Sequence, residues 1–514
     1  GESDIYIPSF LARHIKPHQV EGVRFMWKNL VMFAKSGCIL AHAMGLGKTF
    51  QVIVIVFVLL EEVRKGNPAI PEHFRSRRIL ILLPPTLRKN WMREINTWIP
   101  KTWLRRTIGH HGGILLTGYQ LFRDLSIGMS TSGKTPLSDD ELTLYQRYLL
   151  DPGPALVVAD EGHTIKNPNS KVSIATKRFK TKSRVCLTGY PLQNNLSEYW
   201  CMVDFVHPGC LGHLADFRNA YVHPIENGMY PDSTRSDVRL FRTKLYILHD
   251  ILKDFVLRRE PVVLQRELPP KREFVITCKL PALQHSLYTE ILENELQYGN
   301  AFNAGKGLIA NEIILRNICN HPYIFKLSLN KRFRAIQPRG SHGIKMVVLM
   351  HMAEMCVRNG DKMLIFSRGI PTLDYIESIF RTASWSSFTN KRRYMRLDGT
   401  TNMAARQPLV EEFNSNPNLN FFLISSGTGS LGLNLPSANR VVLMDAGWNP
   451  SFDEQAIARA YRYGQTKPVF VYRLTTCGTM EDKVLKNNVH KIGLSKRVVD
   501  HKNVEKRYTK SQLK

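Results

Sequence analysis

The chain has 514 residues, which is too long for one ordinary hydrophobic core, so we expect two or more domains. Its 71 lysines and arginines outnumber 43 aspartates and glutamates, and the resulting net charge of +28 favours a polyanionic partner, nucleic acid before an acidic membrane surface. The longest apolar run, residues 50–60, is too short to cross a bilayer, and no signal-peptide pattern opens the chain. The eight scattered cysteines form no CxxC pair, which is typical of buried thiols in a reducing compartment and argues against structural zinc.

The first predicted helix begins near Gln19, since apolar residues recur at helical spacing from Val20 onward. A glutamine amide can both donate to and accept from an adenine edge, so Gln19 is a candidate base-reading residue. As an isolated residue, a glutamine here is equally compatible with a surface or capping role.

Residues 39–49 have the order strand, phosphate-binding loop, helix. Gly45 and Gly47 let the backbone approach an anion without a Cβ in the way. Lys48 is then placed to reach the β- and γ-phosphates of a nucleotide, and the hydroxyl of Thr49 to ligate Mg²⁺. The alternative is a chance turn of the same composition.

One residue departs from the strict phosphate-loop pattern. His42 stands five residues before Gly47, where the pattern has glycine.

Residues 50–60, which follow the loop, are rich in valine and isoleucine, which by propensity favours a strand. Because a phosphate loop must feed a helix, we predict instead a helix that is apolar all round and therefore buried.

Further buried strands are predicted at residues 78–83, 113–117, 155–159 and 184–187, with an amphipathic helix from Trp91 to Trp98. The strand at 155–159 runs directly into Asp160 and Glu161. In an ATPase the first carboxylate completes the Mg²⁺ shell and the second orients or deprotonates the attacking water. Downstream of a phosphate loop, this pair predicts the second half of an ATP-hydrolysing site.

The regular alternation of strands and helices is interrupted in several places. Residues 101–112 are short and basic, and residues 126–143 have the composition of a surface loop. Residues 196–260 and 280–325 are predicted to be mostly helical, and residues 268–271 indicate a domain boundary.

From Lys362 the alternation returns, with strands predicted at residues 363–367, 394–398, 421–425, 441–445 and 469–474. This pattern predicts a second doubly wound domain without its own phosphate loop. Before its last strand, Arg459 and Arg462 are spaced i, i+3 and are expected to share one helix face. They are either solvated surface residues or arginine fingers that reach the γ-phosphate of a nucleotide held by the first domain.

Taken together, these motifs resemble those of the Swi/Snf-type ATPases, the double-stranded-DNA translocases of helicase superfamily 2, and most closely the branch of ATRX and its androgen-receptor-interacting relative. The resemblance covers nearly the whole chain. Tyr190 departs from the family pattern, which usually has threonine. The motifs in chain order are MGLGKT at 44–49, DEGH at 160–163, LTGYPLQNN at 187–195, LRNICNHPY at 315–323, RLDGT at 396–400, GSLGLN at 429–434, WNP at 448–450 and QAIARAYRYGQ at 455–465.

The resemblance implies an α/β fold of two RecA-like doubly wound lobes with helical insertions, called protrusions, and a C-terminal brace. It places the first lobe at residues 1–262, with a protrusion at about 196–260. The second lobe is expected at residues 263–514. Its implied parts are a protrusion at about 270–330, a core at about 343–484 and the brace at about 485–514.

The resemblance also implies the residues of each site. The implied catalytic residues are Lys48, Asp160, Glu161, Gln455, Arg459 and Arg462. The implied nucleotide-binding residues are Gln19, Gly45, Gly47, Lys48, Thr49 and Gly432, with Thr49 and Asp160 holding the metal. The candidate DNA contacts are Thr86, Lys89, Thr117, Ser367, Arg368, Ser425, Gly427 and Trp448.

The implied activity is ATP-dependent translocation on double-stranded DNA with ATP and Mg²⁺, in chromatin remodelling and without separating the duplex. The implied partners are double-stranded DNA and nucleosomes, with no membrane, and the implied location is the nucleus. Two alternatives stay open: an ATP-gated DNA or nucleosome clamp without productive translocation, and a strand-separating helicase.

Overall fold

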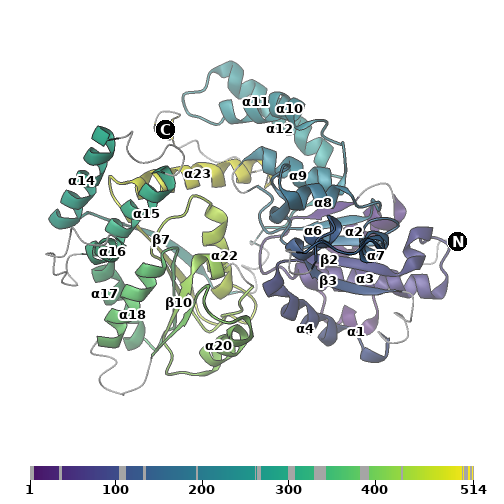
Figure 1. The fold of residues 1–514 in the computed structure, drawn as a ribbon, viewed down its shortest axis with the longest axis horizontal. Helices are drawn as coiled ribbons and strands as arrows, with labels where there is room; N and C mark the ends of the chain where they lie inside the picture. Colours follow the sequence, from purple (N-terminus) through teal and green to yellow (C-terminus); the bar gives the residue numbers. More distant parts are fainter. Residues whose placement is uncertain are drawn as a thin grey trace. The chain divides into compact units, whose positions relative to one another are not determined.

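The computed structural model describes residues 5–33, 37–103, 112–130, 135–192, 195–260, 262, 268–298, 307–328, 343–382, 393–429, 432–500, 502, 508–509 and 512. Most of the basic stretch 101–112 and residues 193–194 of the LTGYPLQNN motif lie outside this set, as do residues 430–431 of GSLGLN. The chain divides into two compact units, each with one sheet (Figure 1). Unit 1 comprises residues 1–263 and 491–512, and unit 2 comprises residues 264–490 and 513–514.

Unit 1 has a six-stranded parallel sheet in the order β3-β2-β4-β5-β1-β6. Its strands are β1 (Cys38–Leu40), β2 (Arg78–Leu83), β3 (Gly113–Gly118), β4 (Leu156–Ala159), β5 (Arg184–Leu187) and β6 (Val256–Leu257). Its α-helices are α1 (Ser9–Ala12), α2 (Pro17–Trp27), α3 (Lys48–Lys65), α4 (Arg88–Trp98), α6 (Tyr119–Ser126), α7 (Asp139–Leu149), α8 (Lys171–Lys177), α9 (Leu196–Val206), α10 (Leu214–Phe217), α11 (His223–Asn227) and α12 (Arg235–Leu252). Short 3₁₀ and π segments are η1 (Lys28–Met32), η2 (Glu72–Ser76), η3 (Pro85–Leu87), η4 (Gly162–Ile165) and η5 (Arg218–Val222).

Both faces of the unit 1 sheet are covered by helices, so its central strands are mostly apolar and buried. Because side chains alternate along a strand, Ile79 and Ile81 of β2 pack in the same cluster as helix α3. Leu80 and Leu82 belong to the opposite cluster, with helices α6 and α9. The prediction that residues 50–60 form a buried helix and not a strand is confirmed, since α3 spans Lys48–Lys65 and is buried along most of its length.

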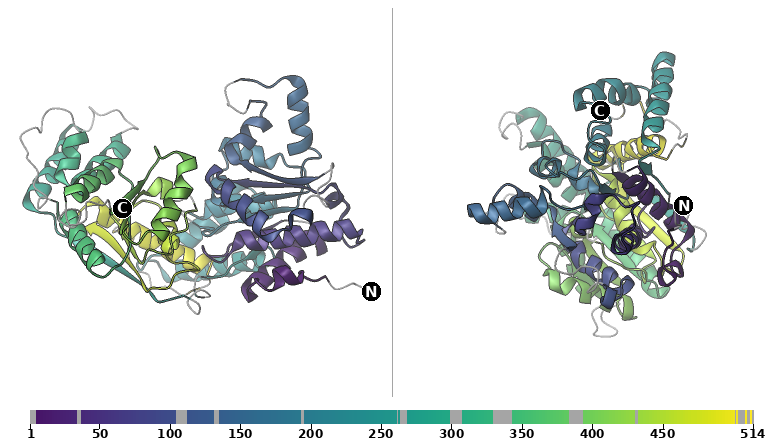
Figure 2. Two further views of the ribbon diagram at one scale, coloured as in Figure 1. Left: turned by 90° about the horizontal axis from the view of Figure 1, so that it is seen from below. Right: turned by 90° about the vertical axis from the view of Figure 1, so that its right-hand side faces the viewer.

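Unit 2 repeats this architecture with a parallel sheet in the order β7-β12-β11-β8-β10-β9, and two further views show the same layers (Figure 2). Its strands are β7 (Lys271–Cys278), β8 (Met363–Ser367), β9 (Tyr394–Leu397), β10 (Phe421–Ser425), β11 (Arg440–Leu443) and β12 (Val469–Thr476). Its helices are α14 (Ala282–Tyr298), α15 (Gly307–Asn320), α16 (Pro322–Ser328), α17 (Ile344–Arg358), α18 (Ile370–Thr382), α20 (Met403–Ser415), α21 (Ser426–Gly429), α22 (Pro450–Ala460) and α23 (Met480–Val498), the last of which continues into unit 1 from Lys491. The two doubly wound domains are therefore confirmed.

Some bounds of the sequence interpretation differ from the structure. Residues 271–278, placed within the helical insertion at 270–330, form strand β7, which pairs with β12 over its whole length. The stretch 196–260 is mostly helical as predicted, and the short strand β6 lies near its end. Helix α7 begins inside the expected loop 126–143, and the residues from Lys491 onward, predicted as part of the brace, group with unit 1.

Among the described residues, no helix is both long enough and apolar enough to cross a membrane.

Candidate active site

The loop between β1 and α3 adopts a conformation that requires its glycines. Gly45 and Gly47 have φ of 84° and 72°, in the left-handed region that favours glycine. A Cβ on Gly47 would also lie 2.3 Å from Nε2 of Gln19, so a side chain here would strain the backbone and displace the Gln19 amide. Thr49 follows in the first turn of α3, where it is half-buried.

Three side chains converge on one carbonyl of this loop. Nε2 of Gln19, Nε2 of Gln51 and a ring nitrogen of His18 each lie 3.2 Å from the carbonyl oxygen of Leu46. Oε1 of Gln19 also accepts from the backbone N–H of Lys16, at 3.0 Å. The structure therefore assigns Gln19 a role in holding the loop, and adenine reading by this residue stays a prediction.

His42, which replaces the first glycine of the strict pattern, lies in the interior of unit 1. Its Nδ1 is 3.3 Å from Nε2 of Gln51, and its side chain is fully buried. Burial, and secondarily the charge of Lys48, lowers the pKa of His42 to about 3, so the imidazole is neutral at physiological pH. The loop accepts a side chain at this position because the ring is buried in the interior of unit 1, and the neutral ring adds no charge to the phosphate site.

Lys48 begins α3 and its ammonium turns back onto the loop. Nζ donates to the carbonyl oxygens of His42 and Ala43, at 2.8 and 3.3 Å. Burial lowers the pKa of Lys48, while the charges of Glu161 and Asp160 act in the opposite direction. The predicted cation and the two predicted carboxylates therefore interact electrostatically within one unit.

Asp160 and Glu161 follow β4, at the same carboxyl edge of the sheet as the phosphate loop. Oδ2 of Asp160 accepts from the indole N–H of Trp91 at 2.7 Å, and Oδ1 accepts from the backbone N–H of Glu161 at 2.9 Å. Tyr119 donates its hydroxyl to the carbonyl oxygen of Asp160, at 2.6 Å. Burial, and then the neighbouring charge of Glu161, raises the pKa of Asp160 well above its ordinary value.

Glu161 has φ of 51° and ψ of 55°, which is rare for a residue with a side chain. One of its carboxylate oxygens lies 3.3 Å from Nδ1 of His163. Strained backbone of this kind costs about 1–3 kcal/mol and concentrates at functional sites. The backbone of Glu161 is therefore compatible with its predicted catalytic role, which stays a prediction.

The donor set fits Mg²⁺. Magnesium prefers oxygen ligands and is usually held by one or two carboxylates together with substrate phosphates. Asp160 is a buried carboxylate whose pKa is raised by burial and by a second carboxylate, and a divalent cation would relieve both effects. Asp160 is therefore a residue that fits the ion, and metal binding by the hydroxyl of Thr49 stays a prediction.

Two arginines that follow β6 were not recognised from the sequence as part of this site. Nη1 of Arg258 donates to the carbonyl oxygens of Ala41 and Gly189, at 2.6 and 2.9 Å, and its Nε pairs with Asp500 at 2.8 Å. The carbonyl of Arg259 accepts from the backbone N–H of Ala43. These two arginines hold the chain on either side of the turn into the phosphate loop. The sequence indicated them only as two adjacent basic residues.

In unit 2, the candidate residues of the last motif do not share one helix face. Helix α22 contains Gln455 and Arg459, both buried, but ends at Ala460. Tyr461, whose ring packs into the apolar core, has non-helical dihedral angles, and Arg462 follows outside the helix. Nη1 of Arg462 donates to the carbonyl of Leu433, at 3.2 Å.

Gly432 stands beside that same carbonyl. It has φ of 73°, so this position too requires glycine. Among the described residues, Oε1 of Gln455 is buried without a hydrogen-bond partner. A buried acceptor of this kind is costly to leave unpaired, which is compatible with a ligand-facing role.

The candidate DNA contacts of unit 1 lie at or just beyond the carboxyl ends of β2 and β3. Thr117 is buried near the end of β3, Thr86 is half-buried on η3, and Lys89 is exposed on α4. Oγ1 of Thr86 is buried without a hydrogen-bond partner among the described residues.

The candidate DNA contacts of unit 2 lie at the carboxyl edge of the unit 2 sheet. Arg368, Gly427 and Trp448 are exposed, whereas Ser425 and Ser367 are buried. The Ser367 hydroxyl donates to Oδ2 of Asp445 at 2.6 Å, so it is engaged within the protein.

Comparisons with known families identify the class of protein to which the chain belongs. Residues 18–324 match the SNF2-related domain, and residues 345–464 match the helicase conserved C-terminal domain. The chain therefore belongs to the SNF2 family of ATPases, within the chromatin-remodelling and helicase class.

Similar curated proteins indicate the branch of the family to which the chain is related. The chain is 36% identical to Protein CHROMATIN REMODELING 20 of Arabidopsis thaliana, with 100% of this chain and 40% of the relative covered. It is 33% identical to Helicase ARIP4 of Homo sapiens (100% and 44%) and 31% identical to Transcriptional regulator ATRX of Mus musculus (97% and 26%). It thus spans less than half the length of these relatives, and the predicted likeness to the ATRX and ARIP4 branch is confirmed.

Proposed function

We propose that the chain is the motor of an ATP-dependent double-stranded-DNA translocase that acts in chromatin remodelling. The observation that carries the proposal is the grouping, at one sheet edge of unit 1, of a phosphate loop with Lys48 and of Asp160 and Glu161. Such a grouping serves phosphoryl transfer, in which the protein contributes positioning and charge stabilisation.

In this mechanism the chain's own residues have separate tasks. The loop N–H groups and Lys48 would bind the phosphates of ATP, and Thr49 and Asp160 would hold Mg²⁺, which would neutralise phosphate charge. Glu161 orients and deprotonates the attacking water. Trp91 and Tyr119 fix the position of Asp160 through its carboxylate and its backbone.

We assign Arg459 and Arg462 to the charge that develops on the γ-phosphoryl group, and Gln455 and Gly432 to the same nucleotide. An arginine finger contributes on the order of 10³–10⁵ in rate, so hydrolysis would depend on both units. The planar guanidinium can contact two phosphate oxygens at once, which a lysine cannot.

The DNA part of the proposal rests on charge and on placement. A surplus of +28 attracts phosphates without reading sequence. Exposed Lys89 and Arg368 lie beside strand ends, as do Thr86, Thr117, Ser425, Gly427 and Trp448. The names of the relatives support a nuclear, nucleosomal setting, which we propose for this chain as well.

The decisive experiment is steady-state ATP hydrolysis with and without duplex DNA, for the parent and for Lys48→Ala. We expect duplex DNA to stimulate the parent, and Lys48→Ala to lose turnover while it keeps its DNA affinity. Hydrolysis that ignores duplex DNA would contradict the proposal.

A second assay separates translocation from its alternatives. Displacement of a triplex strand without unwinding of a forked duplex is the expected result for a translocase. Stimulated hydrolysis without triplex displacement would favour an ATP-gated clamp, and fork unwinding would favour a strand-separating helicase.

A further inference from the structure

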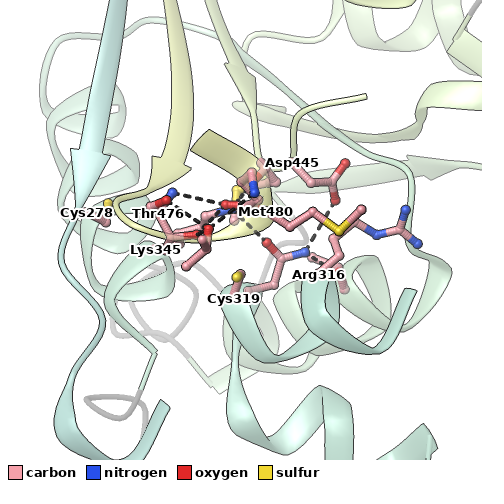
Figure 3. A network of polar contacts seen from close by, with 12 residues as sticks. Cys278, Arg316, Cys319, Lys345, Asp445, Thr476 and Met480 are labelled. Atoms are coloured by element: carbon pink, nitrogen blue, oxygen red, sulfur yellow. Dashed lines mark hydrogen bonds and ion pairs between the residues drawn. The ribbon is translucent and has the colours of Figure 1, made fainter. Parts of the chain in front are cut away.

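A lysine with no exposed surface lies beneath the carboxyl edge of the unit 2 sheet. Nζ of Lys345, near the start of α17, donates to Oε1 of Glu481 at 2.6 Å, to the carbonyl of Met444 at 2.8 Å and to Oδ1 of Asn320 at 3.2 Å (Figure 3). An ammonium has three donors, so this one is fully satisfied. Lysine is almost never fully buried unless it is paired, which marks the position as special.

The network continues from Lys345 to the end of β8. Nδ2 of Asn320 donates to Oδ2 of Asp445 at 3.3 Å. The same carboxylate accepts the Ser367 hydroxyl at 2.6 Å and, through Oδ1, the backbone N–H of Arg368 at 2.9 Å. Asp445 therefore holds two consecutive residues of the loop that carries a proposed DNA contact.

The network also reaches the first turn of α23. The second carboxylate oxygen of Glu481 accepts from the backbone N–H and the hydroxyl of Thr476, the last residue of β12, at 3.0 and 2.5 Å. Glu481 is only 5% exposed, so the pair that it forms with Lys345 is shielded from solvent. Both partners of the pair are thus fixed from several elements at once.

Only one arrangement of these groups satisfies every member. The Asn320 amide must turn its oxygen to the ammonium of Lys345 and its NH₂ to the carboxylate of Asp445. In the flipped amide the NH₂ donor would face the ammonium, and the oxygen acceptor would face the carboxylate. Buried ion pairs contribute little net stability, but a fully connected network fixes one geometry. Its effect is therefore expected on the position of the β8 loop more than on the free energy of unfolding.

We propose that Lys345 is a positioning residue for DNA binding: with Glu481, Asn320 and Asp445 it sets the loop after β8 so that Arg368 meets a DNA phosphate. This inference rests on the proposed function. The guanidinium of Arg368 is exposed, and one of its nitrogens lies 3.4 Å from a carboxylate oxygen of Glu312 on α15. The backbone of Arg368 is thus fixed by the network, while its charged end is in reach of solvent and of an acidic neighbour.

The test replaces both charges together, as Lys345→Met with Glu481→Gln, so that no buried charge is left unpaired. The control is Arg440→Met with Asp361→Asn, a pair at 2.7 Å near the opposite, amino ends of β11 and β8. Duplex-DNA affinity is measured for each from 50 to 200 mM salt, together with the unfolding midpoint. Both double variants are expected to shift the midpoint only modestly, because a buried ion pair contributes little net stability.

Only the Lys345 variant is expected to change the salt dependence. Loss of one phosphate contact reduces the slope of log K against log salt by about 0.9, whereas a merely structural defect leaves the slope unchanged. Arg368→Ala should show the same reduction, and combining it with the Lys345 double variant should give no further loss. If the Lys345 double variant does not fold, Ser367→Ala, which removes one bond to Asp445, should lower the slope in the same direction.

Two outcomes would overturn the inference. A parental slope in the folded Lys345 variant, or losses that add fully with Arg368→Ala, would show that the network does not act on this contact. A parent chain that does not bind duplex DNA would overturn the proposed function itself, and with it this inference.

Discussion

The indole N–H of Trp91 on α4 donates a 2.7 Å hydrogen bond to Oδ2 of Asp160, at the end of β4. The two residues are 69 positions apart, and both are buried. Burial raises the pKa of Asp160, and the bond from Trp91 acts against that rise because it favours the ionised carboxylate. A tryptophan that had been noted only as part of an amphipathic helix therefore tunes the proposed metal ligand.

Trp91→Phe keeps most of the buried ring and removes the donor. The pKa of Asp160 should rise further, so that Mg²⁺-dependent ATP binding fails at a higher pH than in the parent. An unpaired buried acceptor costs about 1–3 kcal/mol, so some loss of stability is also expected. Titration of a fluorescent ATP analogue at several pH values would reveal the shift, and identical profiles for variant and parent would contradict this role.

Glu161→Gln should bind Mg·ATP and fail to hydrolyse it, because the amide keeps the shape and loses the base. Single-turnover hydrolysis and equilibrium ATP binding, measured side by side, separate these effects. His163→Gln, which alters the neighbour of Glu161 without removing the carboxylate, serves as the comparison. An equal loss of ATP affinity in Glu161→Gln would assign the residue to metal binding instead.

Arg462→Ala should weaken ATP binding only modestly, while DNA-stimulated turnover falls by on the order of 10³ or more. Arg462→Lys should not restore turnover, since a point charge lacks the planar fork. Because Arg462 also donates to the carbonyl of Leu433, circular dichroism must show that the fold is intact. Turnover within a few-fold of the parent would return Arg462 to a packing role.

The pair of Asp361 and Arg440 gives a prediction about pH. Burial of Asp361 opposes ionisation, but the hydrogen bonds from Arg440, Asn439 and Lys467 outweigh it and hold its pKa below the ordinary value. A lowered folded pKa contributes stability above the unfolded value of about 3.9, and this stability is lost as the pH falls through the folded value.

The double variant Arg440→Met with Asp361→Asn removes that contribution. Its deficit in unfolding free energy relative to the parent should be largest near neutral pH and should shrink below about pH 4. Urea unfolding of both proteins from pH 3 to 7 measures the difference. A deficit that grows as the solution becomes more acidic would contradict the argument.

Sequence patterns predicted the elements whose burial is uniform and local. The strands before Asp160 and Ser367 were found because each is a short apolar run, and α3 because a phosphate loop demands a helix. Strand β7 was missed because Lys271–Cys278 is largely exposed and opens with three charged residues, and its pairing with β12, about two hundred residues later, defines it as a strand.

The site was predictable where adjacent residues carry the chemistry, as in Lys48 with Thr49 or Asp160 with Glu161. It was not predictable where partners come from distant elements. Trp91 and Arg258 join the site through bonds that span 69 and 217 residues, and no local periodicity records them. Arg462 was misplaced because the i, i+3 spacing puts two residues on one face only within a helix, and α22 ends at Ala460.

The left-handed backbone of Glu161 lowers the stability of the fold at the residue whose carboxylate the proposed mechanism requires. A side chain in that region costs about 1–2 kcal/mol relative to glycine, so the conformation that orients the proposed base destabilises the folded state. Glycine at this position would relax the backbone and remove the carboxylate together. Substitutions selected only for thermal stability would therefore remove the proposed catalytic carboxylate, so stability and catalysis make opposite demands on position 161.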